Sequence, residues 1–288
     1  MIPRSLSRFT CRTALRVVGM ISTVLAAAAA APAAACPGAE SPCAVADGRY
    51  YVELPAGDDG ASPMPVIVWF HGWQDTGANA IANRGLVESW TDAGWLFAAA
   101  DGREKTWAHV GSPSDARDDL AHVRSVIADI RARWPVDESR VLAAGFSQGG
   151  SMVWDVACRI GAPFTHFAPV SGAFWEPLPE GDCPAGPVRL AHEHGSADTV
   201  VPMEGRPIGD SWRQGDVLEG FAILRETADC ADAPARTYGD GPFDCRAWGS
   251  SCRGPADLRL CLHDGGHRVL EGWSARTRAW VAETAPAR

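Results

Sequence analysis

Short apolar runs alternate with segments of helical periodicity along this sequence, and the alternation restricts the possible folds more than any other feature. A strand is expected at residues 65–70, and residues 66–70 are apolar at every position, as a strand covered on both faces should be. Residues 120–134 instead place apolar side chains at spacings of three and four, which gives a helix one apolar stripe. Further strands are expected at residues 50–54, 95–100, 141–146, 164–170, 188–192, 243–248 and 258–263, and further helices at 149–160, 217–224 and 274–281. Such an order predicts an α/β fold with a mainly parallel central sheet and helices on both faces, whose functional residues lie at the carboxyl ends of the strands.

The first 35 residues have the layout of a secretory signal peptide. Four arginines without an acidic residue precede an apolar stretch and an alanine tract that ends at Ala35. The apolar stretch is shorter than the ~20 residues of a membrane span, and Pro32 interrupts it. We expect cleavage before Cys36, which leaves residues 36–288 as one catalytic domain of a secreted or periplasmic protein. An uncleaved anchor and a lipid on Cys36 are the alternatives.

Charge and composition limit the possible partners. Hydrophobic residues make up 46% of the chain, as in a folded globular protein, so disorder is excluded. The formal net charge is −9, and removal of the arginines of the signal would make the chain more acidic. We therefore expect no nucleic-acid partner, no membrane contact after cleavage, and a monomer.

Eight of the nine cysteines lie after the signal, in a chain bound for an oxidising compartment, and predict four disulfides. Eight cysteines allow about a hundred pairings, but their neighbours in the sequence narrow the choice. Two cysteines are close together at the new N-terminus, and two others lie in expected strands that flank a turn around Arg253, where a hairpin sets them opposite each other. The expected pairs are Cys36–Cys43, Cys158–Cys183, Cys230–Cys252 and Cys245–Cys261. No C-x-x-C pair exists, so we expect no metal site.

A G-x-S-x-G motif follows the strand expected at residues 141–146 and precedes an expected helix. A sharp turn from strand to helix makes the side chain of Ser147 project, and glycines on both sides remove the Cβ atoms that would clash. The motif in this context predicts that Ser147 is a nucleophile. The alternative is that Ser147 only caps the helix.

A serine nucleophile needs a base and a group that orients the base. Asp198 follows the strand expected at residues 188–192, and His267 lies in a glycine-rich loop after the last expected strand. The order serine, acid, histidine is that of a hydrolase triad on an α/β sheet. We prefer His267 over His263, which ends the strand itself, and interpret Asp264 as a solvated turn residue. His192 and His194 alternate along a strand without an evident third ligand, so we interpret them as structural.

Two backbone N–H groups are expected to stabilise an oxyanion. Gln148, the residue after the nucleophile, supplies one of them. Trp73 supplies the other, because Gly72 lets the chain turn its amides inward after the strand at residues 66–70. We interpret the neighbouring His71 as a residue that packs in this loop. Trp73 and Trp107 are candidates for contact with substrate, and no cofactor is expected.

Several motifs together resemble the secreted polyhydroxybutyrate depolymerase and feruloyl esterase group of α/β-hydrolases. The resemblance covers residues 50–280 and rests on His71-Gly72, Asp118-Asp119-Leu120, Trp134-Pro135-Val136-Asp137, Gly145-Phe146-Ser147-Gln148-Gly149-Gly150, the stretch from His194 to Pro202, and Gly266-His267. It implies a disulfide-stabilised α/β-hydrolase fold, a triad of Ser147, Asp198 and His267, and a carboxylic ester as substrate. The group commonly has Trp-Pro-Gly after the histidine, whereas this chain has Arg268-Val269-Leu270. The chain also leaves no room for a polymer-binding appendage, so we expect soluble or oligomeric hydroxyalkanoate, feruloyl or acetyl esters.

Other functions stay open from the sequence. The serine motif and the stretch from His194 to Pro202 are also similar to the acyl-protein thioesterases and small carboxylesterases, although the expected signal and disulfides argue against an intracellular enzyme. A non-catalytic binding protein on the same fold is a second alternative. An acyltransferase is a third, because it shares the acyl-enzyme and differs only in the group that attacks it.

Overall fold

The structure is a computed structural model, and it describes residues 41–286. The signal peptide expected at residues 1–35 and the cysteine expected to pair with Cys43, Cys36, lie outside the described residues. No helix in the described part of the chain is long and apolar enough to cross a membrane.

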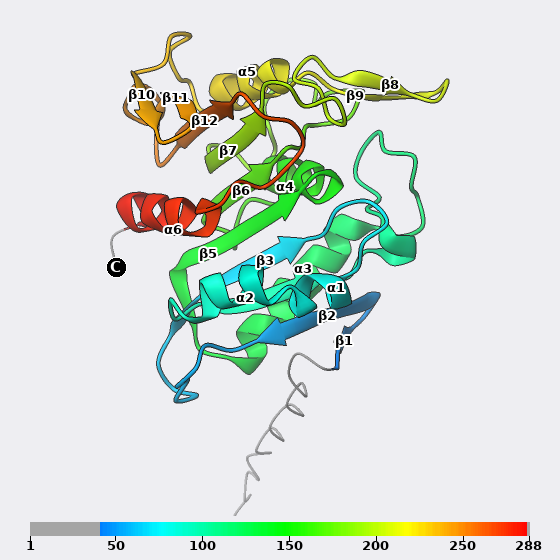
Figure 1. Cartoon of the computed structure of the whole chain (residues 1–288), viewed down its shortest axis with the longest axis vertical. Coiled ribbons are helices and arrows are strands. Elements are labelled where there is room, and N and C mark those ends of the chain that lie inside the picture. The colour runs from blue at the N-terminus through cyan, green and yellow to red at the C-terminus, as the bar shows by residue number, and fades with distance from the viewer. Residues whose placement is uncertain (1–40, 287–288) are drawn as a thin grey trace, which may run out of the picture. The chain divides into compact units, whose positions relative to one another are not determined.

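A sheet of ten strands forms the centre of the described region (Figure 1). The strands, in their order across the sheet, are β1 (Cys43–Val45), β2 (Gly48–Glu53), β4 (Leu96–Ala100), β3 (Met64–Phe70), β5 (Val136–Phe146), β6 (His166–Val170), β7 (Arg189–Gly195), β12 (Asp257–His263), β11 (Phe243–Ala247) and β10 (Arg236–Asp240). The six central strands from β4 to β12 are parallel, and the outer strands pair antiparallel. The expected α/β class with a mainly parallel sheet is confirmed.

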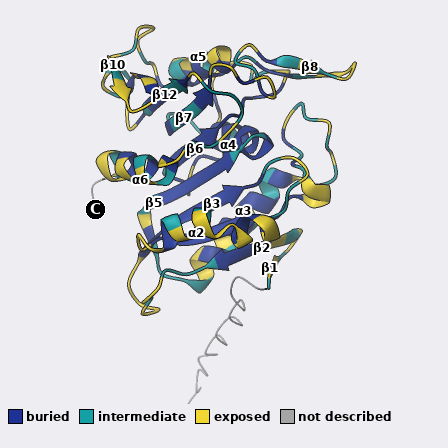
Figure 2. Ribbon diagram, viewed as in Figure 1, coloured by how far each residue is buried: buried dark blue, intermediate teal, exposed yellow. Residues whose placement is uncertain are grey.

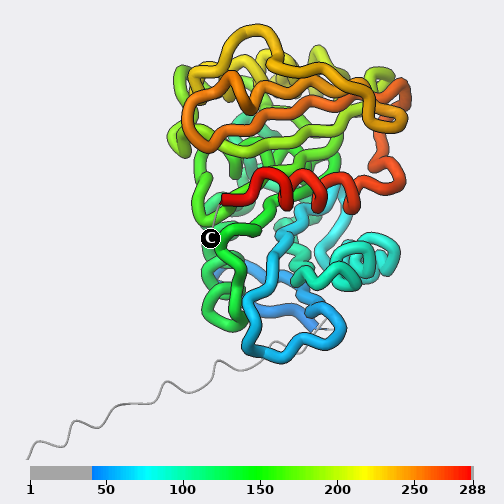
Figure 3. Tube along the Cα trace, turned by 90° about the vertical axis from the view of Figure 1, so that its left-hand side faces the viewer, coloured from blue at the N-terminus to red at the C-terminus, as the bar shows by residue number. Residues whose placement is uncertain are grey.

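Helices cover both faces of this sheet, and each face has its own core. On one face α3 (Asp119–Arg133), α4 (Gln148–Arg159) and α5 (Val217–Thr227) pack on side chains that include Val66, Val68 and Phe70. On the other face α1 (Gly77–Ala82), α2 (Arg84–Thr91) and α6 (Trp273–Thr284) pack on Ile67 and Trp69 (Figure 3). Because successive side chains of a strand point to opposite faces, the uninterrupted apolar run of β3 serves both cores. The central strands and α4 are accordingly the most deeply buried elements (Figure 2).

Three disulfides have both cysteines within the described residues, and they join Cys158 to Cys183, Cys230 to Cys252 and Cys245 to Cys261. Each of them joins two cysteines that the sequence analysis pairs. Cys245 and Cys261 are direct partners in the antiparallel register of β11 and β12, so the hairpin sets them opposite each other.

Several elements were not expected from the sequence. Two short strands, β8 (Arg206–Ile208) and β9 (Trp212–Gln214), form a separate ribbon that projects beyond the carboxyl ends of the central strands (Figure 1). The loop between β4 and α3 projects at the same edge of the sheet. β1, β10, α1 and α2 are also additions. The ribbon and the loop matter for function, because both line the cleft described next.

Candidate active site

Ser147 lies at the sharp turn between β5 and α4. Its backbone has φ 58° and ψ −124°, a conformation that an L-residue adopts only when its surroundings enforce it. The flanking glycines show the enforcement: a Cβ at Gly149 would lie 2.0 Å from the carbonyl oxygen of Phe70, and a Cβ at Gly145 would lie 2.8 Å from the same atom. The close approach of β3 to this turn thus requires both glycines and holds Ser147 outward.

The side chains of Ser147, His267 and Asp198 form one chain of hydrogen bonds. His267 Nε2 lies 2.8 Å from Ser147 Oγ, and His267 Nδ1 lies 2.7 Å from Asp198 Oδ2. The second contact, between a ring N–H and a carboxylate, fixes Nδ1 as the protonated nitrogen and leaves Nε2 as the acceptor for the serine hydroxyl. The ring of Phe146 lies 4.6 Å from the imidazole ring and packs beside it. These three residues come from three different loops at the carboxyl ends of β5, β7 and β12.

The carboxylate of Asp198 is fully buried and saturated with donors. Asp198 Oδ1 accepts the backbone N–H groups of Val200 and Val201 at 2.8 and 2.9 Å, while Oδ2 accepts His267. Burial by itself would raise the pKa of Asp198, but the hydrogen bonds from His267 and from the two amides outweigh burial and lower the pKa below its usual range. Asp198 therefore carries a negative charge at the end of the chain of hydrogen bonds.

The loops that carry Asp198 and His267 are bound to each other. Ser196 N–H donates to the carbonyl of His263 at 2.7 Å, and Ala197 N–H donates to the carbonyl of Gly265 at 3.1 Å. The ring of His263 accepts the N–H of Gly265 at 2.9 Å, so His263 shapes the loop from behind and does not contact Ser147. Asp264 is exposed, as the sequence analysis expects of a turn residue.

His192 and His194 lie buried behind Asp198. His192 Nε2 lies 2.8 Å from His194 Nδ1, and His194 Nε2 donates to the carbonyl of Val201 at 2.7 Å. Desolvation lowers the pKa of both histidines, so both are neutral. Both ring nitrogens of His194 and Nε2 of His192 are thus taken up by this contact and by the backbone. Among the described residues, no group of three or more His, Cys, Asp or Glu side chains is placed to hold a metal ion.

A cleft of about 1010 Å³ opens over Ser147 and His267. Its walls come from the loop after β3, the loop between β4 and α3, the segment after β6, the segment after Asp198 and the ribbon β8–β9. They include Trp73, Thr106, Asp115, Trp175, Val200, Ile208 and Gln214. Trp73 is 68% exposed at the rim of the cleft, the position expected of a substrate-contacting residue. The sequence indicated neither the ribbon nor the polar residues of the β4–α3 loop, because both lie in segments without apolar periodicity.

Trp107 does not line the cleft, so the expectation that it contacts substrate is wrong. Its side chain is fully buried, its indole N–H donates to the carbonyl of His71 at 2.8 Å, and its ring packs edge-on against Phe70. An indole buried with its N–H satisfied is a packing residue. Trp107 instead supports the loop that carries Trp73.

The two expected oxyanion donors lie on segments that border Ser147. Gln148 is the first residue of α4, where backbone N–H groups have no partner within the helix and the helix dipole favours negative charge. Gly72 lies beside Ser147, since a Cβ on Gly72 would be 3.5 Å from the Cβ of Ser147. The loop that contains Trp73 therefore passes close to Ser147. This arrangement of serine, imidazole, buried carboxylate and nearby backbone amides is suited to acyl transfer.

The chain is similar in sequence to several fungal esterases. It is 26% identical over 228 residues to a probable feruloyl esterase C of Aspergillus terreus and 25% identical over 228 residues to feruloyl esterase C of Emericella nidulans, and each match covers 77% of both chains. It is 24% identical over 240 residues to feruloyl esterase B of Piromyces equi, covering 78% of this chain and 43% of that one. No protein-family model matches the chain.

Solved structures show the same fold. An acetyl xylan esterase from Aspergillus awamori matches with a TM-score of 0.59 at 14% identity, covering 81% of this chain and 93% of that one. A phospholipase/carboxylesterase from Dyadobacter fermentans matches with a TM-score of 0.54 at 15% identity, covering 83% of this chain and 99% of that one. Together with the parallel sheet and its helices, these matches confirm the α/β-hydrolase fold.

Proposed function

We propose that this chain, a carboxylic-ester hydrolase of the feruloyl-esterase-like group of α/β-hydrolases, cleaves its substrate through an acyl-enzyme on Ser147. The observation that carries the proposal is the chain of hydrogen bonds from Ser147 through His267 to the buried Asp198 at the cleft. A serine that is hydrogen-bonded to an imidazole oriented by a carboxylate can lose its proton as it attacks a carbonyl carbon.

Each residue has a definite part in the proposed reaction. Ser147 Oγ attacks the ester carbonyl while its proton passes to His267 Nε2, and the backbone N–H groups of Trp73 and Gln148 stabilise the oxyanion. His267 then gives the proton to the leaving alcohol, which leaves the acyl group on Ser147. A water molecule, deprotonated by His267, then attacks the acyl carbon, and His267 returns the proton to Ser147 Oγ as the acid leaves. Asp198 stays ionised throughout and stabilises the positive charge that His267 carries during both transfers.

The substrate that we propose is a soluble or oligomeric ester, with feruloyl, acetyl and hydroxyalkanoate esters as candidates. The similarity to feruloyl esterases supports an aromatic acyl group, and the exposed indole of Trp73 at the rim of the cleft gives such a group a surface to pack on. We also propose that the enzyme is exported. The three disulfides and the signal-like residues 1–35 support export, and N-terminal sequencing of the exported protein should begin at Cys36.

The central test replaces the nucleophile. Ser147→Ala should abolish hydrolysis of p-nitrophenyl acetate and methyl ferulate, because the hydroxyl is the attacking atom, while the thermal unfolding temperature stays close to that of the wild type. Wild-type enzyme should react with a fluorophosphonate probe at Ser147, and the variant should not. Residual activity above a tenth of the wild-type value, or a wild-type protein that neither hydrolyses esters nor takes up the probe, would contradict the proposal. Acetylated xylan and hydroxybutyrate oligomers in the same assay rank the candidate substrates.

A further inference from the structure

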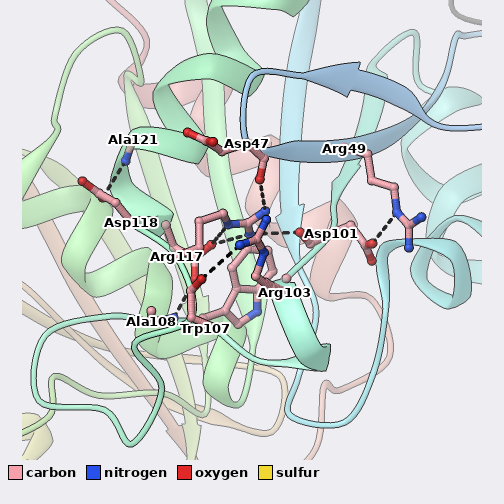
Figure 4. A network of polar contacts seen from close by, with 12 residues as sticks. Asp47, Arg49, Asp101, Arg103, Trp107, Ala108, Arg117, Asp118 and Ala121 are labelled. Atoms are coloured by element: carbon pink, nitrogen blue, oxygen red, sulfur yellow. Dashed lines mark hydrogen bonds and ion pairs between the residues drawn. The ribbon is translucent and has the colours of Figure 1, made fainter.

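The loop between β4 and α3, residues 101–117, is closed at its base by one arginine. Arg117 Nη2 donates to the carbonyl of Asp101 at 3.0 Å, and Nη1 donates to the carbonyl of Asp47 at 3.1 Å (Figure 4). Arg117 Nε donates to Asp119 Oδ1 at 2.7 Å, and Nη2 also bonds this oxygen. The two side chains are only 5% and 1% exposed. A single guanidinium thus joins the first residue of the loop, its last residue and the start of α3.

Asp119 connects this base to the interior of the loop. Its second oxygen, Oδ2, accepts the backbone N–H of Ala108 at 2.6 Å. Ala108 follows Trp107, whose indole N–H donates to the carbonyl of His71. By binding the N–H of Ala108, the carboxylate of Asp119 therefore fixes the neighbouring Trp107 in the position from which its indole bonds to the loop after β3.

The loop after β3 is bonded to residues 102–107 on both sides of Trp73. Before Trp73, His71 Nε2 accepts the N–H of Gly102 at 2.9 Å, and His71 Nδ1 donates to the carbonyl of Gly72 at 2.8 Å. After Trp73, the N–H of Gln74 donates to the carbonyl of Lys105 at 2.8 Å. Hydrogen bonds to the β4–α3 loop thus fix the backbone on both sides of Trp73.

The same loop reaches the other proposed oxyanion donor. Thr106 Oγ1 lies 2.7 Å from Nε2 and 3.0 Å from Oε1 of the Gln148 side chain, and both residues line the cleft. Residues 102–108 therefore contact both segments that present a backbone N–H to the proposed oxyanion.

A buried ion pair contributes little net free energy to the stability of a fold. Removing two charges from water costs several kcal/mol, and apolar residues of equal volume often serve stability as well or better. What a guanidinium and a carboxylate supply instead is direction, because the planar fork of arginine and the two oxygens of aspartate fix several backbone groups at set angles. One of the groups fixed by this pair is the N–H of Ala108, and the neighbouring Trp107 is hydrogen-bonded to the loop after β3 that contains Trp73.

We propose that Arg117 and Asp119 are positioning residues for the oxyanion hole: by closing the β4–α3 loop they set the position of the Trp73 N–H over Ser147. The proposal rests on the function proposed above. It gives the Asp118-Asp119 motif a role in the reaction without contact with substrate. Oxyanion stabilisation is a transition-state interaction, so disturbing the pair should lower kcat and leave substrate binding nearly unchanged.

The test uses Asp119→Asn and Arg117→Lys, with Arg140→Lys as the matched control. Arg140 also pairs with a buried carboxylate, Asp137, but at the amino end of β5, far along the strand from Ser147. With p-nitrophenyl acetate, kcat should fall about tenfold to a hundredfold in the two loop variants, with KM within twofold of wild type. The affinity for a trifluoromethyl ketone, which forms a tetrahedral oxyanion on Ser147, should fall by the same factor. Arg140→Lys should leave all three quantities unchanged.

A further measurement separates positioning from folding. Amide hydrogen exchange of the peptide that covers residues 71–76 should quicken in the loop variants, while that of β5 and β6 does not. If Asp119→Asn fails to fold, Arg117→Lys, which keeps the charge and loses the fork, carries the test. Unchanged kcat in folded variants, a rise in KM alone, or lost activity without quicker exchange at residues 71–76 would overturn the proposal while the esterase assignment stands. A wild-type enzyme without esterase activity would overturn both.

Discussion

Asp198 keeps a full negative charge although its side chain has no contact with solvent. Three donors, His267 and the amides of Val200 and Val201, compensate for the loss of water. An isolated buried carboxylate would take up a proton, so the loops after β7 and β12 have to supply these donors for Asp198 to stay charged. The negative charge of Asp198 fixes the tautomer of His267, because it keeps the proton of the ring on Nδ1.

Replacement of Asp198 by asparagine should therefore damage catalysis much more than structure. An asparagine that keeps its oxygen on the amides of Val200 and Val201 turns its NH₂ group toward His267, which favours the opposite tautomer and removes the acceptor from Ser147. We expect kcat for p-nitrophenyl acetate to fall by about three to four powers of ten. Circular dichroism at pH 7 should stay native. A variant that keeps more than a tenth of the wild-type kcat would show that Asp198 does not orient the base.

At the scale of single residues, the sequence predicts a role where local pattern and chemistry coincide. Ser147 stands between glycines at the end of an apolar strand, and His267 follows two glycines after another strand. The structure brings both to one place, with Asp198 between their loops. Trp107 has no such pattern: a tryptophan in a polar loop is compatible with a cleft or a core, and only the fold of residues 101–117 decides for the core.

Among the elements, the β11–β12 hairpin connects a disulfide to the site. The bridge between Cys245 and Cys261 holds β11 against β12, and His267 follows β12 by four residues. β12 is also fixed by seven register pairs with β7 and by the bond from Ser196 to the carbonyl of His263. The strand should therefore keep its place without the bridge, although with greater freedom at its end.

We expect the double change Cys245→Ser and Cys261→Ser to lower kcat a few-fold and to leave the circular dichroism spectrum native at 25 °C. A bridge that closes a loop of this length contributes ~3 kcal/mol, which corresponds to a fall in Tm of about 6–12 °C for a domain of this size. The matched control is Cys230→Ser with Cys252→Ser, which opens a loop of similar separation beside α5. The control should lower Tm alike and leave kcat unchanged. Equal kcat in both double variants would contradict a link from the hairpin to His267.

The elements that the sequence predicts are those whose side chains face a core. The central strands and α3, α4, α5 and α6 carry apolar side chains at a strand or helix period because they pack on the sheet. The ribbon β8–β9 has three residues in each strand and little buried surface, so it leaves no periodic signal. α1 consists of the residues Gly-Ala-Asn-Ala-Ile-Ala and is similarly faint. Elements that shape the cleft are thus the ones that sequence pattern detects least.

Across the whole described region, burial keeps most histidines neutral. Desolvation lowers the pKa of His109 to about 4, and it lowers those of His122 and His166 to about 3, with nearby arginines adding to the effect at the latter two. In the unfolded chain each of these residues titrates near its ordinary value of about 6.5. Burial acts in the opposite sense at Asp155, where it raises the pKa to about 6.

These shifts predict that the protein loses stability in mild acid, above the pH at which ordinary carboxylates titrate. Between about pH 6.5 and pH 4 the unfolded chain binds protons on the three histidines while the native chain does not, so the free energy of unfolding falls as the pH falls. Each histidine lowers the free energy of unfolding by up to ~1.4 kcal/mol per pH unit. Asp155 has the opposite effect, of similar size, because it takes up its proton at a higher pH in the native state than in the unfolded chain. These four groups together give a net loss of about 3 kcal/mol between pH 6 and pH 5, and the neutral His192 and His194 add to it. Urea unfolding at each pH measures the loss. His166→Gln should reduce this loss by about 1 kcal/mol, because it removes one titrating group.

The control is Thr284→Val, which removes a hydroxyl 3.1 Å from His166 Nε2 and leaves the histidine in place. It should lower the free energy of unfolding equally at both pH values. A stability that is constant from pH 6 to pH 5 would show that the buried histidines gain protons in the native state, and the neutral interior described above would then be wrong.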